Sequence, residues 1–526
     1  MMTELYEHDA VEMGALLTRG ETTSVALIEA HLARADAVDG DLNAFVHRFD
    51  EQALAEAKRA DEERAAGRSR GPLHGIPISI KESMATQGVA STLGLAKRQG
   101  DIQDKDAVVV QLLREAGAIV LGKTNIPQLL LSHESENPIW GAVNNPWDLT
   151  RAPGGSSGGE GAAIASGMSP WGVGTDIGGS IRVPAAFSGI AGLKPTVDRW
   201  SNRGSFTGLT GQEVVRGQCG PMARTVRDVA TLFGALDPGA MAKLDPSVAP
   251  VAVADPSQVN LSGLRVGVFT DDGFITPAAS VMRGVEEAAE HLRAAGCDVV
   301  QYEPPLAQEI IETYYAALSS DGGVTGKAAL QGEVVTPQLH ELMRTALLPG
   351  WVRRIATSVI HSRGEVRVAQ VLRQIGEKSV ATYWHLTYRR AALRLAALDA
   401  WAAAGLDAVL CPPHATPAVG HRQSGDFTPA GCYAMRYNFL NLPAGVVPVS
   451  RVRDDETQRP APTGRRPDRV DRKAALVEAG TAGLPVGVQI AAMPYREDLV
   501  LALMAAVEAG ARATASYPTT PVTPRA

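Results

Sequence analysis

Hydrophobic residues recur with helical spacing in the first part of the chain. In the stretch TTSVALIEAHLARADAV they follow Ser24, which can cap a helix, and the Ala- and Glu-rich residues 50–67 continue the helical pattern. The apolar positions that share one helical face are Val25, Ile28, Leu32 and Ala35. The pattern predicts that residues 1–70 form a helical collar packed against a larger domain that spans residues 71–526.

Short apolar runs and helical patterns alternate along the rest of the chain. GIPISIKES and GAIVLGKTN are typical of buried strands followed by turns, and a helix of period 3.6 is expected between them, over residues 106–116. Four further strand candidates are LRVGVF, LDAVLCP, AGVVPVS and GLPVGVQIAA, which begin at Leu264, Leu406, Ala444 and Gly483. This alternation predicts an α/β fold.

A charged segment interrupts this pattern towards the C-terminus. The sequence RVRDDETQRPAPTGRRPDRVDRK contains prolines and has no apolar periodicity. We therefore expect residues 452–473 to form a solvated, disordered insertion.

The composition is that of a globular protein whose partner is a small molecule. The 526 residues are 45% hydrophobic and 20% charged, which is enough to bury a large core. The 50 Lys and Arg residues against 57 Asp and Glu residues give a net charge of −7, which argues against a nucleic-acid partner.

The cysteines and the N-terminus bear on the location of the protein. The four cysteines form neither a CxxC pair nor a disulfide framework, so we expect a reducing compartment and no metal site. The stretch MMTELYEHDAVEMGALL has acids where a secretory signal carries basic residues, and no apolar run reaches the roughly 20 residues of a spanning helix. These features predict a cytoplasmic protein.

Two glycine-flanked serines carry the strongest chemical signal: Ser156 in PGGSSGGEGA and Ser180 in GTDIGGS. GGSSGG alone is typical of a linker, but the residues that follow, 162–173, are small and apolar, which indicates a buried segment. A phosphate-binding loop would need a lysine that GGSSGGEG lacks. The GxSxG elbow of α/β-hydrolases matches residues 154–158 in form, yet it must follow a strand, and NNPWDLTRAP is a proline-broken loop.

The remaining template is a serine hydrolase in which Ser180 attacks a carbonyl carbon. The backbone N–H groups that would bind the oxyanion are those of Ile177, Gly178, Gly179 and Ser180. No histidine is tied to either serine by a motif, so a lysine is the candidate base. Lys81 ends the apolar strand GIPISIK, and burial would lower its pKa from about 10.4 to roughly 7 or 8, at a cost of about 4 kcal/mol. A strand-end lysine with its amine in water is the alternative interpretation.

Together these motifs resemble the amidase signature family. GIPISIKES, GKTNIPQ, NNPWD, PGGSSGGEGA, GTDIGGSIRVPAAFSGIAGLKPT, GPMARTVRDVA and GLPVGVQIAAMP occur in the family's order. The resemblance implies a cofactor-free catalytic domain over residues 71–526 with the amidase signature fold, a large mixed β-sheet core surrounded by many helices. It also implies a triad in which Lys81 is the base, Ser156 is a bridging serine on a cis peptide, and Ser180 is the nucleophile.

The resemblance further implies supporting roles for the neighbours of the triad. Ser157 would hydrogen-bond the lysine, Thr175 would support the serine pair, and Asp176 with Arg182 would brace the loop. Ordinary turn capping is the alternative interpretation of these residues. Arg224 in GPMAR is expected to hold structure.

Within the family, the similarity is to the fatty acid amide hydrolases, through GGEGA, YNFLNLPAGVVPVSRV and LPGWVRRI. In that branch the last region forms a cap beside the acyl-chain channel and touches the membrane. Here a cap insertion is expected over residues 340–375, and residues 344–373 carry six arginines against one acid, Glu365. The apolar helical stripe of this cap is Leu348, Val352, Ile355 and Val359. Weak peripheral membrane contact is one expectation, and a solvated core helix is the other.

The expected activity is hydrolysis of acyl amides, with fatty acid amides and esters included, through an acyl-enzyme on Ser180. The partner is a small acyl amide and not a nucleic acid, and a homodimer is left open. The expected substrate-pocket residues are Leu130, Leu131, His133 and Trp351. One alternative is the amidase subunit of a tRNA-dependent amidotransferase, against which the cap argues. Another is a catalytically silent binding module, which would require a broken triad.

Overall fold

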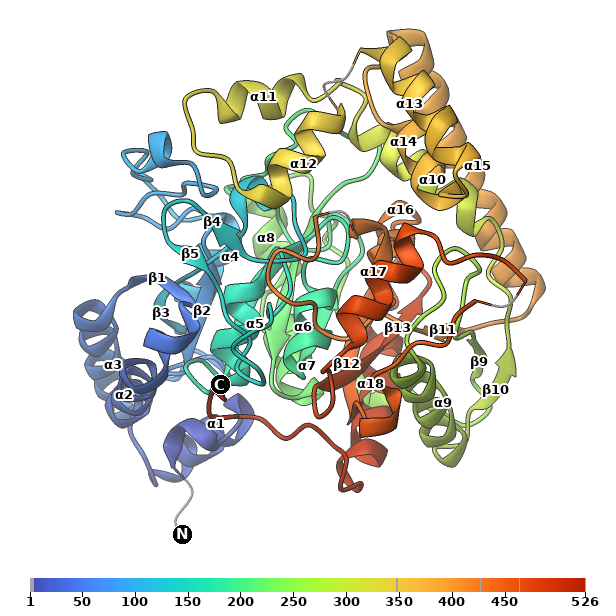
Figure 1. The fold of residues 1–526 in the computed structure, drawn as a ribbon. Helices are drawn as coiled ribbons and strands as arrows, with labels where there is room; N and C mark the ends of the chain where they lie inside the picture. The colour runs from blue at the N-terminus through green and yellow to red at the C-terminus, as the bar shows by residue number, and fades with distance from the viewer. Residues whose placement is uncertain (1–3, 347–348, 426, 463, 526) are drawn as a thin grey trace.

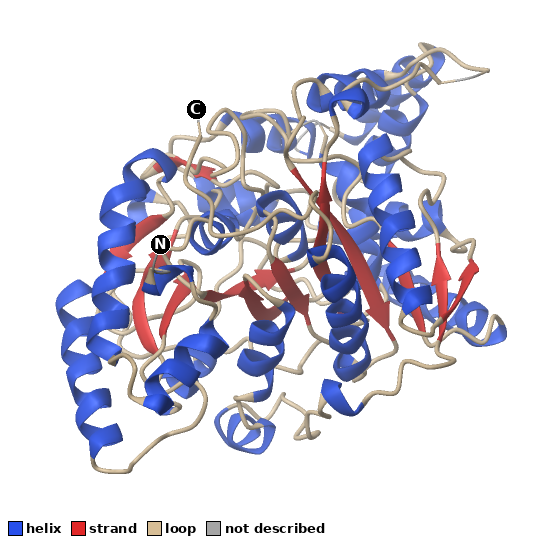
Figure 2. Cartoon of the chain, turned by 90° about the horizontal axis from the view of Figure 1, so that it is seen from below, coloured by secondary structure: helices blue, strands red, loops and turns tan. Residues whose placement is uncertain are grey.

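Eleven strands form one mixed β-sheet through the middle of the molecule (Figures 1 and 2). The computed structural model describes residues 4–346, 349–425, 427–462 and 464–525. The strands are β1 (Phe45–Arg48), β2 (Pro77–Lys81), β3 (Ile119–Thr124), β6 (Trp171–Asp176), β7 (Ala191–Lys194), β8 (Gln218–Ala223), β9 (Arg265–Val268), β10 (Asp298–Gln301), β11 (Ala408–Cys411), β12 (Ala444–Arg451) and β13 (Pro485–Ala492). Their order is β1-β3-β2-β6-β8-β7-β12-β13-β11-β9-β10, with parallel pairs around β2 and β9 and antiparallel pairs elsewhere. A separate hairpin joins β4 (Glu136–Asn137) to β5 (Gly141–Ala142).

Helices cover both faces of this sheet (Figure 2). In the described part of the chain they are α1 (Ala10–Arg19), α2 (Ser24–Leu42), α3 (Asp50–Ala65), α4 (Val108–Glu115), α5 (Gly158–Ala165), α6 (Arg182–Ser188), α7 (Val226–Gly234), α8 (Pro238–Leu244), α9 (Ala279–Ala294), α10 (Ala307–Leu318), α11 (Val324–Leu330), α12 (Pro337–Ala346), α13 (Gly350–Ser362), α14 (Val366–Gln374), α15 (Val380–Ala403), α16 (Cys432–Phe439), α17 (Arg469–Glu478) and α18 (Glu497–Arg512). The predicted α/β fold with a large mixed sheet and many surrounding helices is confirmed.

The central strands are continuous apolar runs in the sequence because helices cover both faces of the sheet. Val446 of β12 packs in a cluster with residues of α6 and α16, whereas the next residue, Val447, packs on the other face with α9 and α18. The six strands predicted from such runs are β2, β3, β9, β11, β12 and β13, and the predicted helix over residues 106–116 is α4.

The first 70 residues contribute more than helices. α1, α2 and α3 match the predicted helical collar, but β1 lies between α2 and α3 and pairs with β3 as the edge strand of the main sheet. Arg224, after β8, is buried and donates hydrogen bonds to the carbonyl oxygens of Tyr6 and Glu7, which ties the N-terminal segment to the sheet. The division of the chain at residue 70 stays a prediction.

The charged segment at 452–473 differs from the predicted disordered insertion. It contains a 3-10 helix, Asp454–Glu456, and the first residues of α17. Arg459 forms an ion pair of 2.5 Å with Glu478, and Arg367 of α14 forms one of 2.6 Å with Asp468. The expectation failed because the pattern of charges does not reveal that carboxylates of the folded chain partner these arginines.

Candidate active site

Lys81 lies at the carboxyl end of β2, beside the carboxyl end of β6, where Thr175 is found. The two strands are parallel neighbours, so side chains from these ends meet at the same edge of the sheet. The Lys81 Nζ lies 2.7 Å from Ser156 Oγ, 2.9 Å from Ser157 Oγ and 2.8 Å from Thr175 Oγ1. The structure thus brings together four residues that the sequence predicted for the site.

The Lys81 side chain is fully buried. Burial lowers the pKa of its amine to about 7, although the negative charge of Asp176 acts in the opposite direction. The alternative interpretation, a lysine with its amine in water, is therefore wrong. An amine with this pKa is partly neutral at pH 7, so it can accept and return a proton.

Ser156 follows a cis peptide bond after Gly155. A Cβ at Gly155 would lie 2.5 Å from the carbonyl oxygen of Ser132, so this tight approach needs glycine. The N–H of Ser157 donates a hydrogen bond of 3.1 Å to the carbonyl oxygen of Ser180, which places the two serine motifs side by side. Ser156 and Ser180 both line a cavity of about 390 Å³.

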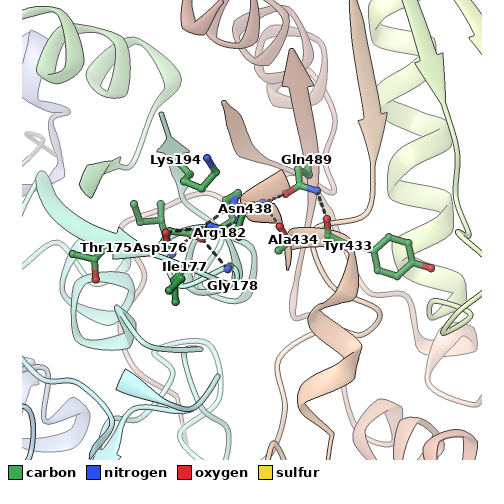
Figure 3. A network of polar contacts seen from close by, with 12 residues as sticks. Thr175, Asp176, Ile177, Gly178, Arg182, Lys194, Tyr433, Ala434, Asn438 and Gln489 are labelled. Atoms are coloured by element: carbon green, nitrogen blue, oxygen red, sulfur yellow. Dashed lines mark hydrogen bonds and ion pairs between the residues drawn. The ribbon is translucent and has the colours of Figure 1, made fainter. Parts of the chain in front are cut away.

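The loop that carries Ser180 is folded around the carboxylate of Asp176 (Figure 3). The carboxylate accepts hydrogen bonds from the N–H groups of Gly179 at 2.8 Å and Ile181 at 3.1 Å. The bond to Asp176 removes Gly179 from the predicted set of oxyanion donors, because its N–H is already engaged. The three predicted donors whose N–H groups have no acceptor among the described residues are Ile177, Gly178 and Ser180.

Arg182 holds Asp176 in place from the first turn of α6 (Figure 3). Its guanidinium donates to both oxygens of Asp176, at 2.9 and 3.0 Å. Burial opposes ionisation of Asp176, but the charge and hydrogen bonds of Arg182 outweigh burial and keep the pKa of Asp176 well below its usual range. The remaining guanidinium donors reach acceptors on α16 and β13: the Ala434 carbonyl at 2.8 Å, Asn438 Oδ1 at 2.5 Å and Gln489 Oε1 at 2.6 Å.

This network joins the loop to segments far away in sequence. Asn438 and Gln489 were not predicted as site residues, and they stand 256 and 307 positions from Arg182. Both occur within the longer motifs that resemble the fatty acid amide hydrolases and the amidase signature family. That resemblance was the one signal available for them, because no local pattern links them to Arg182.

Two arms of the cavity meet at Ser180. The apolar arm has a volume of about 160 Å³ and is lined by Leu130, Leu131, His133, Tyr314, Leu318, Met343, Ile375 and Met435. The polar arm is the part of the larger cavity lined by Asp198, Asn202, Gln212, Glu213, Arg216 and Gln218, and that cavity is also lined by Leu129, Phe206, Leu209 and Val215. In this arm Arg216 forms ion pairs with Asp198 and Glu213. The site can therefore hold a molecule with one apolar and one polar end.

The structure places three of the four predicted pocket residues in the apolar arm, namely Leu130, Leu131 and His133. Trp351 is the exception, because it lies on α13, does not line either arm, and is 70% exposed. The prediction for Trp351 is wrong because its side of α13 faces solvent. Within the described residues, no group of three His, Cys, Asp or Glu side chains is placed to hold a metal ion.

A comparison with protein families identifies the family to which the protein with this site belongs. The family model described as Amidase matches residues 26–501. The chain belongs to the amidase family. The match includes the lysine strand, both glycine-flanked serine motifs and the segment that carries Gln489.

Individual amidase relatives agree with this assignment. Fatty-acid amide hydrolase 1 of Sus scrofa is 38% identical over 443 residues, which cover 84% of this chain and 76% of the relative. Fatty acid amide hydrolase 1 of Caenorhabditis elegans is 33% identical over 503 residues, which cover 94% of this chain and 86% of the relative. A solved structure of fatty acid amide hydrolase superposes with a TM-score of 0.84 at 27% identity, covering 97% of this chain and 86% of that one. The chain is an amide-hydrolysing enzyme.

Proposed function

We propose that this amidase hydrolyses acyl amides through an acyl-enzyme on Ser180, with Lys81 as the base and Ser156 as the proton relay. The observation that carries the proposal is the buried Lys81 amine, 2.7 Å from Ser156 Oγ, whose pKa burial lowers to about 7. Asp176 and Arg182 support the loop, as described above. The catalytically silent alternative has no support in this constellation, since each triad residue is present.

In the proposed reaction, neutral Lys81 takes the proton of Ser156, and Ser156 takes the proton of Ser180. Ser180 Oγ bonds to the carbonyl carbon, and the carbonyl oxygen becomes an oxyanion near the free N–H groups of the loop. The C–N bond then breaks while the proton returns through Ser156 to the leaving nitrogen. Water then gives a proton to the same relay and bonds to the carbonyl carbon of the acyl-enzyme. The bond from this carbon to Ser180 Oγ breaks as the relay returns the proton to Ser180, so the products are a carboxylic acid, an amine and free Ser180.

The two arms of the cavity indicate where each end of the substrate binds. We place the acyl chain in the apolar arm, beside Leu318 and Met343, and the amine in the polar arm, beside Arg216 and Gln218. The substrate would then be an acyl amide with an apolar acyl chain and a polar amine. The amidotransferase alternative would instead require a second protein chain as partner.

A panel of acyl p-nitroanilides of increasing chain length tests this function. We expect kcat/KM to rise by about fourfold for each methylene that enters the apolar arm, because burying a methylene is worth about 0.8 kcal/mol. The gain should stop once the chain fills the arm. The control series keeps the acyl group constant and lengthens an alkyl amine, and it should bring no such gain. Equal gains in both series would contradict the assignment of the arms, and hydrolysis of no acyl amide would contradict the function.

The cap, residues 340–375, is the region predicted to contact a membrane. Leu348 of the predicted stripe lies outside the described residues, but Trp351, Ile355 and Val359 of α13 are exposed. α13 and α15 lie at an outer edge of the molecule (Figure 1), and α15 exposes Val380, Trp384 and Tyr388. Arg354, Arg363 and Arg373 are also exposed. We propose that this surface makes a weak, salt-sensitive contact with anionic membranes, worth about 1 kcal/mol per basic residue.

The described chain contains no helix long and apolar enough to cross a bilayer. We also propose a reducing, cytoplasmic location, in line with the four cysteines, Cys219, Cys297, Cys411 and Cys432, which are buried and unpaired.

Replacing Ile355 with Ser should weaken the membrane contact without touching the catalytic site. We expect a severalfold rise in KM for a long-chain amide presented in anionic vesicles, and an unchanged KM for a short, soluble anilide, because only the former is delivered from the lipid surface. Co-sedimentation with phosphatidylserine vesicles at low and high salt measures the contact directly. Ile102→Ser is the matched control, since Ile102 and Ile355 are both 59% exposed. If both variants bind vesicles like the unmodified protein, the cap has no membrane role.

A further inference from the structure

The hydroxyl of Tyr314 donates a hydrogen bond of 3.0 Å to the carbonyl oxygen of Ile177, in the loop that carries Ser180. Tyr314 stands on α10, 137 positions away in the chain, and is only 3% exposed. A Cβ at Gly178 would lie 2.4 Å from this hydroxyl, so glycine is what allows the close approach. The hydroxyl therefore rests directly against the peptide unit between Ile177 and Gly178.

This contact fixes the direction of one N–H group. A trans peptide unit is planar, and its C=O and N–H point in opposite directions. Because Tyr314 holds the oxygen of Ile177 on one side, the N–H of Gly178 points to the other side, away from α10. This N–H has no acceptor among the described residues, and Gly178 lines the apolar arm together with Ser180.

The next peptide unit follows the same geometry with different partners. Its oxygen, on Gly178, lies 3.1 Å from His133 Nε2, and its N–H, on Gly179, donates to Asp176 at 2.8 Å. Burial lowers the pKa of His133, so the ring is neutral and its Nε2 carries the donated hydrogen. Both units are thus held at their oxygens, but only the one held by Tyr314 leaves its N–H free.

We propose that Tyr314 is a positioning residue, which orients the Gly178 N–H towards the oxyanion of the substrate by holding the carbonyl of Ile177. This inference rests on the proposed acyl-enzyme mechanism. Preorganised donors stabilise an oxyanion because they need no reorientation when the charge develops. Without the Tyr314 hydroxyl, the Ile177 carbonyl loses its partner and the peptide unit is free to rotate, so the N–H is no longer held in place.

The same residue links the loop to the acyl group. Tyr314 and Leu318, one turn apart on α10, both line the apolar arm, and α10 packs against α14, α15 and α16. An acyl chain in this arm contacts the tyrosine whose hydroxyl holds the loop. We expect this contact to restrict the Tyr314 ring and tighten its hold on the loop, so that the transition state is stabilised more than the bound substrate. A longer chain then raises kcat as well as lowering KM.

The test compares two inhibitors that differ in one feature. A trifluoromethyl ketone with an octyl chain adds Ser180 Oγ to its carbonyl carbon and forms an oxyanion, whereas the corresponding secondary alcohol fills the same arm without forming one. In Tyr314→Phe we expect the affinity for the ketone to fall about tenfold and the affinity for the alcohol to stay within about twofold. The rise of kcat with chain length should also disappear.

Tyr315→Phe is the matched control, because Tyr315 is the next residue, lines the same arm, and has a buried hydroxyl with no partner among the described residues. It should change the affinity for both inhibitors alike. If Tyr314→Phe and Tyr315→Phe give the same ratio of ketone to alcohol affinity, Tyr314 does not position the loop. If the unmodified enzyme itself binds the ketone no more tightly than the alcohol, the acyl-enzyme mechanism fails, and this inference with it.

Gly178→Ala is a second test of the same inference, for the case in which Tyr314→Phe folds poorly. The new methyl group would meet the Tyr314 hydroxyl and push it from the Ile177 carbonyl. We expect the same selective loss of ketone affinity, with the thermal unfolding midpoint recorded for each variant. An unchanged ketone affinity in Gly178→Ala would overturn the inference.

Discussion

Ser180→Ala is expected to abolish covalent labelling by a fluorophosphonate probe and to lower kcat for an acyl anilide by a factor on the order of 10⁴ to 10⁶. The substitution removes the oxygen that bonds to the carbonyl carbon. The Asp176 carboxylate, which holds this loop through the N–H groups of Gly179 and Ile181, is untouched, so the fold should persist. Intact-mass spectrometry after probe treatment, together with circular dichroism, measures both expectations.

The neighbouring serines provide the controls for this variant. Ser156→Ala should retain slow labelling, since it removes the relay and leaves the nucleophile. Ser169→Ala should label at the normal rate, because Ser169 only donates to the carbonyl of Trp171, at 2.6 Å, and does not line the cavity. Probe mass found on Ser156 in the Ser180→Ala protein would show that the nucleophile is Ser156.

Local patterns predicted the parts of the fold that local forces determine. Strands such as β2 and β13 are continuous apolar runs because helices cover both faces, and such runs can be read from the sequence. β1 was missed because its four residues, FVHR, carry no such run, and its place at the sheet edge depends on pairing with β3.

The candidate site also has residues that the sequence predicts and residues that it does not. Lys81, Ser156 and Ser180 were predicted because motifs mark them; in the structure the two serines line one cavity, and the buried Lys81 amine donates a hydrogen bond to Ser156. Gly179 was predicted to be an oxyanion donor because the sequence does not distinguish one glycine of the pair from the other. In the folded loop the N–H of Gly179 already donates to Asp176. Tyr314 was missed because its partner lies 137 positions away, and no periodicity records a contact of that kind.

Lys81→Met is the variant that tests the proton relay. We expect it to lower kcat/KM for amides by a factor on the order of 10⁴, and to lower it less for matched esters. An amide nitrogen is a poor leaving group that must be protonated as the C–N bond breaks, whereas an alkoxide of an activated ester departs without that proton. Equal losses for an ester and an amide with the same acyl group would contradict a relay that returns the proton.

The pH dependence of the unmodified enzyme provides the second readout. The active form has a neutral Lys81, and burial sets its pKa at about 7, so kcat/KM should rise with pH up to about 7 and then level off. In Lys81→Met this rise should vanish from the residual activity. Other buried groups also titrate near this pH, because burial raises the pKa of Glu160 to about 7 and lowers that of Lys194 to about 7.

Lys194→Met is therefore the decisive control for the pH profile. Lys194 is a buried lysine like Lys81, but its amine donates to the carbonyl of Pro195 and contacts neither serine. The variant should keep the rise in kcat/KM near pH 7 if Lys81 is the titrating base. Glu160→Gln should keep it as well, with a shift to lower pH, because the charge of Glu160 raises the pKa of Lys81. If the rise in kcat/KM is lost in Lys194→Met and retained in Lys81→Met, the titrating base is Lys194 and not Lys81.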